Sequence, residues 1–412
     1  MDQGSYKAAF ATVEEAVADI RAGRMVVVVD DEDRENEGDL TLAAEFVSPE
    51  AINFMARYGR GLICLTLTEE RADYLRLSPM TAENTSRFGT AFTETIEARE
   101  GVTTGISAAD RAHTIRVAID PRTTANDLAR PGHVFPLRAR KGGVLVRAGQ
   151  TEASVDLARM AGLVTAGVIC EIMNEDGTMA RVPDLVQICA LHQMKMVTVA
   201  ALIRYRLQHE RYIHRTAEAV LPTQYGDFRM IAYESEVDGA ESHVALVCGG
   251  EAGEQDGGEP VLVRVHTHCL AGDVFGATLC DCHILVDNSL RMIAEAGKGA
   301  LIYLHNGARG FGIDRTGTAA GGAVAPHRLV LHRDTNREPK TGEGSDDRQR
   351  VQRTLRQVGL GGQILSDLGI RRIRLLTNTP THIPALQGFG IEIVEQVKIP
   401  LNTAAAVTAP LG

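Results

Sequence analysis

Three cysteines in the second half of the chain are the residues whose types and spacing point most directly to chemistry. Cys269, Cys280 and Cys282 lie close together in the sequence. Three thiolates bind Zn²⁺, and a zinc ion whose fourth position stays open can activate a water molecule. Buried structural thiols are the alternative. The chain has seven cysteines, and this odd number favours free thiols and a metal site over a disulfide framework.

An acidic segment near the N-terminus indicates a second metal site. Seven carboxylates lie between Asp30 and Asp39, together with Arg34. Carboxylates that repel one another need a cation, and hard oxygen ligands suit Mg²⁺, held by one or two of them with substrate oxygens. Arg34 could clamp a phosphate with its planar guanidinium. The alternative is a solvated acidic turn, because runs of charge are usually solvated.

Two single residues are further candidates. His133 lies between Pro131 and Pro136, where it is either a satisfied core residue or an imidazole aimed by a rigid backbone. Glu171 stands among apolar neighbours, and a carboxylate there is costly unless it is paired, metal-bound or functional.

The hydrophobic pattern predicts the elements that must position these groups. Val26 to Val29 are typical of a short buried strand, and this strand would carry the acidic segment at its carboxyl end. The segment 142–153 predicts a strand followed by a helix N-terminus. Other strands are predicted at 61–67, 168–173, 228–235, 242–248, 261–266 and 372–378, and helices at 11–22, 48–58, 198–211 and 364–370. Thr12 is the predicted N-cap of the first helix.

The length of 412 residues argues for two or three domains. The predicted division is a first domain over residues 1–208, a polar linker containing Pro222 over 209–223, a second domain over 224–400, and a flexible tail over 401–412. The expected fold class is α/β (α+β), with a mixed β-sheet core and flanking helices in each domain.

Composition narrows the function classes. A formal charge of −10 argues against non-specific nucleic-acid binding, which needs clustered Lys and Arg. The longest apolar run is too short to span a membrane, and the N-terminus lacks a basic and apolar leader. We therefore expect a cytoplasmic enzyme that acts on small molecules, with neither a nucleic acid nor a membrane as partner.

The first half, over roughly residues 10–208, resembles 3,4-dihydroxy-2-butanone 4-phosphate synthase. Several long motifs carry the resemblance in the right order: Asp30 to Asp39, Gly101 to Arg111, Arg130 to Ala139 and Asn174 to Arg181. The resemblance implies a fold of the family's own type, usually dimeric, that converts ribulose 5-phosphate to the four-carbon ketone phosphate and formate with Mg²⁺. Enolisation, dehydration and carbon migration all need proton transfers beside a metal.

The same resemblance implies a role for each matching residue. Arg34 and Glu35 would contact substrate, Glu35 would also bind the metal, and Asp39 would bind the sugar. The segment from Arg147 to Thr151 would hold the phosphate and hydroxyls, and His133 and Glu171 would be the essential acid and base.

Two positions depart from this family. Gln150 stands where the family has a metal-binding histidine. Its amide oxygen can serve Mg²⁺, but it cannot titrate near neutrality as imidazole does. Glu94 stands where the family is usually apolar.

The second half, over roughly residues 218–400, looks like GTP cyclohydrolase II, most clearly in the segment from Arg264 to Cys282. The resemblance implies that Cys269, Cys280 and Cys282 hold zinc, whose bound water attacks the guanine ring. It also implies that Arg264 and Arg309 bind the triphosphate, that Thr377 binds the nucleotide, and that an arginine, Arg356 in the ungapped placement, assists loss of pyrophosphate.

Several partners expected of this family are replaced. His268 and Gly307 each stand where the family has a glutamate. Leu285 stands in the place of a glutamine, and His382 in the place of a lysine. The catalytic Asp-x-Arg becomes Thr354-Leu-Arg356, unless the chain shifts to Asp346-Asp-Arg348. A site built to pair polar groups discriminates strongly when they go unpaired. We therefore expect zinc binding with doubtful opening of GTP.

The leading hypothesis is a homodimeric enzyme that resembles the bifunctional riboflavin-pathway protein, with its synthase half active. A second hypothesis is a divergent paralogue acting on a related sugar phosphate or nucleotide. A third is a non-catalytic partner or scaffold whose zinc holds the fold.

Overall fold

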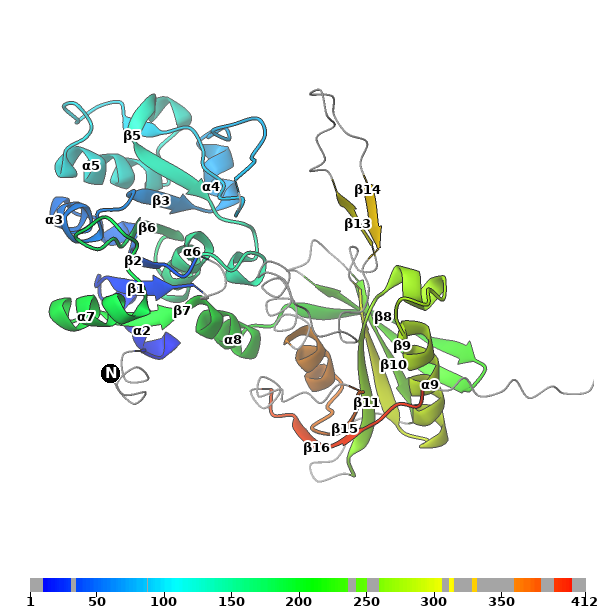
Figure 1. Cartoon of the computed structure of the whole chain (residues 1–412). Helices are drawn as coiled ribbons and strands as arrows, with labels where there is room; N and C mark the ends of the chain where they lie inside the picture. The colour runs from blue at the N-terminus through cyan, green and yellow to red at the C-terminus, as the bar shows by residue number, and fades with distance from the viewer. Residues whose placement is uncertain are drawn as a thin grey trace, which may run out of the picture. The chain divides into compact units, whose positions relative to one another are not determined.

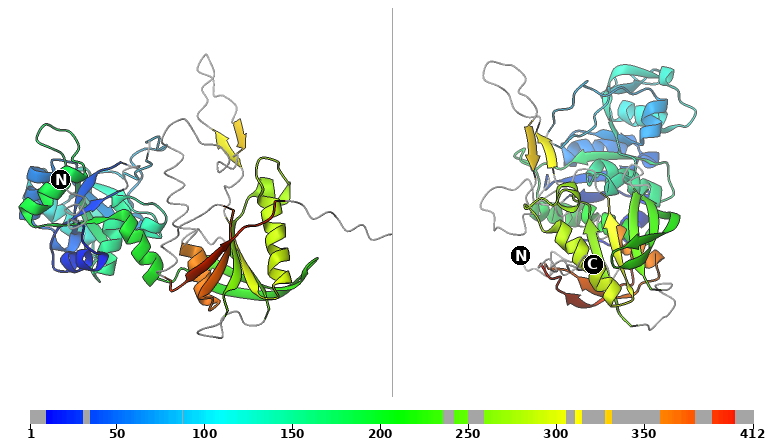
Figure 2. Two further views of the ribbon diagram at one scale, coloured as in Figure 1. Left: turned by 60° about the horizontal axis from the view of Figure 1, so that its bottom comes forward. Right: turned by 90° about the vertical axis from the view of Figure 1, so that its right-hand side faces the viewer.

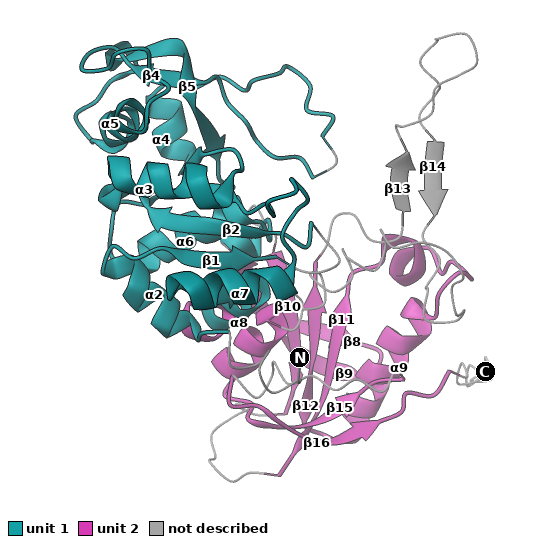
Figure 3. Ribbon diagram, turned by 60° about the vertical axis from the view of Figure 1, so that its left-hand side comes forward, with its two compact units in different colours: residues 1–206 teal, residues 207–412 magenta. Residues whose placement is uncertain are grey.

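A computed structural model describes residues 10–30, 35–86, 88–235, 242–249, 259–305, 311–314, 328–331, 359–378 and 389–401 (Figure 1). The chain divides into two compact units, residues 1–206 and 207–412 (Figure 3). Each contains a seven-stranded sheet in which parallel and antiparallel neighbours mix, which confirms the expected fold class.

The strands of the first unit lie in the order β4-β5-β3-β6-β2-β1-β7. They are β1 (Val26–Val29), β2 (Gly38–Ala43), β3 (Cys64–Leu67), β4 (Ile96–Ala98), β5 (Leu128–Arg138), β6 (Ala166–Glu171) and β7 (Lys195–Thr198). The helices are α2 (Val13–Arg21), α3 (Pro49–Phe54), α4 (Glu69–Tyr74), α5 (Ala108–Ile119), α6 (Gln150–Met160), α7 (Val182–His192) and α8 (Val199–His209).

The predicted strand at Val26 to Val29 is β1, and all four valines are buried. Full burial of each such side chain contributes about 1.5 kcal/mol or more. The strand pairs with β2 in antiparallel register and with β7 in parallel register, so it lies inside the sheet. Thr12 caps α2 as its sequence predicts, because its side chain accepts the amide of Glu15.

The two faces of the first sheet bury different partners. Leu40, Leu65 and Val168 belong to the main core, which also contains residues of α3, α5 and α7. Helix α6 packs on the opposite face, where Thr66 Oγ1 lies 2.7 Å from Ser154 Oγ. Since side chains alternate along a strand, every second residue of β2, β3 and β6 points toward α6.

One predicted strand is wrong. The strand expected at the start of the segment 142–153 is instead a turn with a short 3₁₀ segment, Gly143–Leu145. Gly142 and Gly143 adopt positive φ angles of 92° and 63°, which glycine tolerates and a strand does not use. The helix N-terminus predicted to follow is present as α6.

The sheet of the second unit has the order β16-β15-β11-β12-β10-β9-β8. Its strands are β8 (Ile213–Thr223), β9 (Gly226–Ser235), β10 (Ser242–Cys248), β11 (Val261–Thr267), β12 (Gly299–Leu304), β15 (Arg372–Leu376) and β16 (Glu392–Val397), and β13 (Phe311–Asp314) pairs with β14 (Arg328–Leu331) in a separate ribbon. Helix α9 (Cys282–Glu295) covers one face of the sheet, and a helix over 359–367 covers the other (Figure 2).

The expected linker, 209–223, is also corrected. Residues Ile213–Thr223 form β8, which pairs with β9 from Ile213 opposite Ser235 to Thr223 opposite Gly226. A two-residue turn between Thr223 and Gly226 joins the two strands in an antiparallel hairpin, so a polar edge strand was mistaken for a connection. The predicted tail lies outside the described residues beyond Leu401. Among the described helices, none is long and apolar enough to cross a membrane.

Candidate functional site

A carboxylate pair forms the centre of the candidate site in the first unit. Asp39 on β2 lies directly opposite Glu171 on β6 in the antiparallel ladder, so both side chains emerge on the same face. This is the face that α6 covers, because Glu171 is an even number of residues from Gly167, the position opposite Thr66. Asp39 is buried, with 4% of its surface exposed.

The same register brings His133 to this end of the sheet. Cys64 on β3 pairs with Phe135 on β5 and with Ile169 on β6. His133 precedes Phe135 by two residues and Glu171 follows Ile169 by two, so both lie on the face of the acidic pair. The structure therefore aligns His133, Glu171 and Asp39 along one row of the sheet.

Glu171 is held by the backbone that precedes β3. The amide of Leu62 donates to its Oε2 at 2.7 Å. A side chain at Gly61 would place its Cβ 2.6 Å from the same oxygen, so only glycine fits beside the carboxylate.

The acidic segment after β1 is a loop tied down from two sides. Asp30 accepts the amides of Glu35 at 3.0 Å and Glu37 at 2.9 Å. Arg181 donates to the carbonyl of Glu35 at 2.7 Å and to that of Asn36, and it lies 3.9 Å from the Glu37 carboxylate. These bonds hold Glu35 and Glu37 near Asp39. Arg34 lies outside the described residues.

The electrostatics of this cluster favour a bound cation. Burial, followed by the charges of Glu171 and Glu35, raises the pKa of Asp39 well above its usual range. Burial and the neighbouring Glu35 also raise the pKa of Glu37, against the lowering effect of Arg181. A cation between these groups would relieve the repulsion that raises both values.

The donor set suits Mg²⁺ more than a soft metal. Burial and the charge of Glu171 raise the pKa of the Cys64 thiol and raise that of Cys170 to about 12, so both thiols stay protonated. Among the described residues, groups of three candidate metal ligands within 4.8 Å occur only in the second unit. The acidic cluster therefore offers one or two carboxylates at a time, as Mg²⁺ sites with substrate oxygens do.

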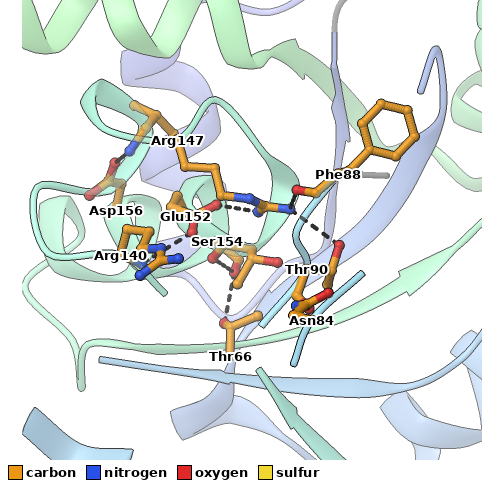
Figure 4. A network of polar contacts seen from close by, with 11 residues as sticks. Thr66, Asn84, Phe88, Thr90, Arg140, Arg147, Glu152, Ser154 and Asp156 are labelled. Carbon is orange, nitrogen blue, oxygen red and sulfur yellow. Dashed lines mark hydrogen bonds and ion pairs between the residues drawn. The ribbon is translucent and has the colours of Figure 1, made fainter. Parts of the chain in front are cut away.

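The predicted phosphate segment forms the start of α6. Gln150 and Thr151 open this helix and are each 5% exposed. Arg147 donates to the buried Glu152 at 2.7 Å and to Thr90 Oγ1 at 3.2 Å (Figure 4). Glu152 thus fixes the Arg147 guanidinium beside a helix N-terminus, whose free amides favour an anion.

A histidine–glutamate pair, which the sequence did not reveal, lies on the edge strand β4 and its neighbour β5. His133 Nδ1 is 2.8 Å from Glu97 Oε2, and Glu97 sits against Gly105, where a Cβ would come 1.6 Å from Oε1.

The role of Arg181 in anchoring the acidic loop was also missed from the sequence, although Arg181 is the last residue of the motif that begins at Asn174. The only signal for Arg181 in the sequence is that a charged residue follows a predicted strand. This signal does not distinguish Arg181 from an ordinary surface arginine. Glu94, the other departure, lies 3.4 Å from the Arg130 Nε.

The second unit brings its three predicted thiols together. Sγ of Cys269 lies 3.9 Å from Sγ of Cys280, and these two and Cys282 lie within 4.8 Å of one another. Ligand atoms on a tetrahedral ion with bonds of about 2.3 Å have about this spacing. Gly272 lies against the group, where a Cβ would be 2.4 Å from the Cys280 sulfur. The three thiols fit a zinc ion.

A buried polar group supports the thiol segment. Asp273 accepts the amide of Cys269 at 2.8 Å, the hydroxyl of Tyr303 at 2.7 Å and a hydrogen bond from His266 at 3.0 Å. Burial alone would raise the pKa of Asp273, but the hydrogen bonds from His266 and Tyr303 lower it. The ionised Asp273 therefore fixes the backbone that carries the first thiol.

Two of the predicted nucleotide residues lie close together, Arg264 on β11 and Thr377 just after the adjacent strand β15. Arg264 on β11 donates to the carbonyl of Leu376 at 3.0 Å, and Thr377 follows that residue directly. Arg309 and Arg356, predicted for the triphosphate and for catalysis, lie outside the described residues.

Comparison with known proteins gives the same division. Residues 14–205 match the family model of 3,4-dihydroxy-2-butanone 4-phosphate synthase, and residues 214–398 match that of GTP cyclohydrolase II. The chain is 53% identical to riboflavin biosynthesis protein RibBA of Aquifex aeolicus, covering 95% of this chain and 93% of the relative. It is 47% identical to RibBA of Bacillus subtilis, covering 95% and 94%.

A solved structure is similar along nearly the whole chain. RibBX of A. baumannii, described as a two domain 3,4-dihydroxy-2-butanone 4-phosphate synthase, is 39% identical with a TM-score of 0.73, covering 94% of this chain and 99% of that one. This chain therefore belongs to the family of riboflavin biosynthesis proteins in which a 3,4-dihydroxy-2-butanone 4-phosphate synthase domain precedes a GTP cyclohydrolase II domain.

Proposed function

We propose that the first unit converts D-ribulose 5-phosphate to 3,4-dihydroxy-2-butanone 4-phosphate and formate. The observation that supports this most is the opposed pair of Asp39 and Glu171, together with the raised pKa of Asp39. A carboxyl group whose pKa is strongly shifted by burial and by neighbouring charges is typical of a functional site, and Glu171 lies directly beside it.

In this proposal the residues divide the chemistry as follows. Glu35 and the amide oxygen of Gln150 hold Mg²⁺, which when bound stabilises negative charge that develops on substrate oxygens. Arg147 and the first amides of α6, including that of Thr151, bind the phosphate. Arg34 contacts the substrate, and Asp39 binds the sugar hydroxyls.

Proton transfer falls to the groups that can titrate. Gln150 cannot exchange a proton near neutrality, so we assign this work to Glu171 and His133. Leu62 holds the Glu171 carboxylate, and Glu97 orients the His133 ring through Nδ1. Nε2 of His133 is then the nitrogen that faces away from Glu97.

For the second unit we propose zinc binding by Cys269, Cys280 and Cys282 with little opening of the GTP ring. Leu285, in the position of the family's glutamine, packs on the apolar cluster beneath α9 and offers guanine no polar contact. RibBX, also a two-domain chain, is described only as a synthase, which agrees with a second domain of other use.

One specific alternative has support. Gln150 and the replaced positions His268 and Leu285 would also suit a paralogue that acts on a related sugar phosphate or nucleotide.

We further propose that the chain is a cytoplasmic homodimer, and a monomeric mass in sedimentation equilibrium would contradict the dimer.

Formate release tests these assignments together. Purified protein receives ribulose 5-phosphate with Mg²⁺, and separately GTP with Zn²⁺. We expect formate from the first reaction and little from the second. Absence of formate from ribulose 5-phosphate would overturn the synthase proposal and leave a paralogue or a scaffold, whereas rapid formate release from GTP would overturn the proposal for the second unit.

A further inference from the structure

Two histidines that neither metal site uses face each other at the ends of neighbouring strands. Nδ1 of His268 lies 3.2 Å from Nδ1 of His305. The two rings are inclined by 64° with centroids 4.9 Å apart. We propose that His268 and His305 bind a divalent transition-metal ion, separate from the ion held by the three thiols.

The strand register places the two residues side by side. Thr267 on β11 pairs with Leu304 on the parallel strand β12, and His268 and His305 are the next residue of each strand. The amide of His268 donates to the carbonyl of Leu304 at 2.8 Å, which extends the ladder by one step. The carboxyl ends of adjacent parallel strands are a frequent location for ligands in α/β sheets.

The spacing of the two nitrogens suits a shared ion. Two imidazole nitrogens bound at about 2.0–2.1 Å in tetrahedral geometry lie about 3.4 Å apart. The observed 3.2 Å therefore needs almost no rearrangement. A direct hydrogen bond between two neutral imidazoles is the alternative, and it would require no metal.

A third histidine stabilises the pair from behind. His243 is fully buried, and its Nδ1 accepts the backbone amide of His305 at 3.1 Å. The Tyr303 ring lies 5.8 Å from the His268 ring, so packing also limits where that imidazole can point. Outer contacts of this kind orient metal ligands and strengthen binding.

The chemistry of the donors sets the class of ion. Neutral imidazole favours zinc, cobalt, nickel and copper, whereas Mg²⁺ prefers oxygen. His305 is exposed, so an ion can enter from solvent. With two protein ligands in place, the remaining positions would hold water or an exchangeable ligand, as in open metal sites.

The location distinguishes this site from the thiol site. Within the described residues, the groups of three close ligand atoms are Cys269 with Cys280 and Cys282, and His266 with Asp273 and Cys282, and neither contains His268 or His305. The inferred metal site is also separate from the proposed reactions. His268 stands where the cyclohydrolase family has a glutamate, and it offers an imidazole nitrogen in place of a carboxylate oxygen.

Cobalt binding to the full-length protein tests the proposal. The thiols are first loaded with one equivalent of Zn²⁺, and Mg²⁺ is kept in large excess to occupy oxygen-rich sites. Co²⁺ uptake is then measured by equilibrium dialysis and metal analysis. We expect the wild-type chain to bind one Co²⁺ more than His305→Ala or His268→Gln, with at least about a tenfold loss of affinity when either ligand is removed.

His214→Ala is the matched control, because His214 is an exposed histidine on the edge strand β8 of the same sheet. It should bind as much Co²⁺ as the wild type. Equal uptake by the wild type and His305→Ala would overturn the proposal, and circular dichroism excludes unfolding as the cause of any loss.

The absorption spectrum separates the two sites. Co²⁺ at the thiols gives sulfur-to-metal charge-transfer bands, whereas Co²⁺ bound by His268 and His305 should give none. When Co²⁺ replaces Zn²⁺ at the thiols, these bands should persist in His305→Ala. Their loss in that variant would show that the imidazole ligates the thiol-bound ion, and it would overturn a separate site.

Discussion

The acidic site of the first unit takes its groups from β2, β6 and the loop that follows β1, whereas the thiol site of the second unit takes all three from the segment between Cys269 and Cys282. Asp39 and Glu171 meet only because the sheet is formed, and burial then raises the pKa of Asp39. The thiols are neighbours in the sequence before folding. The oxygen site therefore depends on the fold to hold like charges together, while the metal itself can organise the sulfur site.

Removal of the Glu171 charge should strongly lower the synthase activity of the first unit without unfolding it. Glu171→Gln keeps an oxygen to accept the Leu62 amide but cannot act as a base, so we expect the synthase rate to fall by about 10³-fold. Formate release measures this rate. Glu175→Gln is the control, because the Glu175 side chain is 95% exposed, and it should retain full activity. A rate for Glu171→Gln within tenfold of the wild type would contradict the assigned role.

Removal of one thiol should affect only the second site. Cys269→Ser should lose the bound zinc, because only two of the three protein ligands would remain and they hold the ion more weakly. We expect the formate rate from ribulose 5-phosphate to change by less than about twofold, since additivity holds for independent sites. Metal analysis provides the readout, with Cys248→Ser, a half-buried cysteine outside the group, as control. Unchanged zinc content would exclude Cys269 as a ligand.

The pH dependence should distinguish the two sites further. The folded-state pKa of Asp39 is raised, so its contribution to stability is present at low pH and is lost as pH rises through that pKa. Mg²⁺ opposes this loss because it favours the charged form. We therefore expect Mg²⁺ to raise the melting temperature more at about pH 8 than at about pH 5. Asp39→Asn should weaken this dependence, and an unaltered dependence in that variant would exclude Asp39 as its source.

The smallest effect concerns orientation. Glu97→Gln should lower the synthase rate by about tenfold and alter its pH profile, because an amide can no longer hold the His133 ring as a carboxylate does. Glu100→Gln, an exposed change close in sequence, should have the wild-type profile. An unchanged pH profile of the rate in Glu97→Gln would show that the contact between Glu97 and His133 is only structural.

Local patterns predicted the elements that local forces determine. The four valines of β1, the cap at Thr12 and the thiol group followed from periodicity, capping and spacing. The strand at the start of the segment 142–153 was predicted wrongly, because the apolar residues there follow a glycine pair whose positive φ angles turn the chain. The edge strand β8 was missed because an exposed strand carries polar residues like those of a linker.

The tertiary contacts of the site could not be predicted from the sequence. Nothing near Glu97 indicated that it would face His133, since β4 and β5 meet through a long connection. The anchoring of the acidic loop by Arg181 likewise depends on a chain segment that arrives from far away in the sequence. Residue types could be chosen from the sequence, but their partners required the sheet register.

Gly61 has a consequence for variation in this chain. Its missing side chain leaves room for a carboxylate that the sequence places more than a hundred positions later. A substitution at 61 would thus displace Glu171 although position 61 has no chemistry of its own. In a library of random variants, losses of synthase activity should therefore appear at 61 as regularly as at 171, and a single reversion at 61 should restore them.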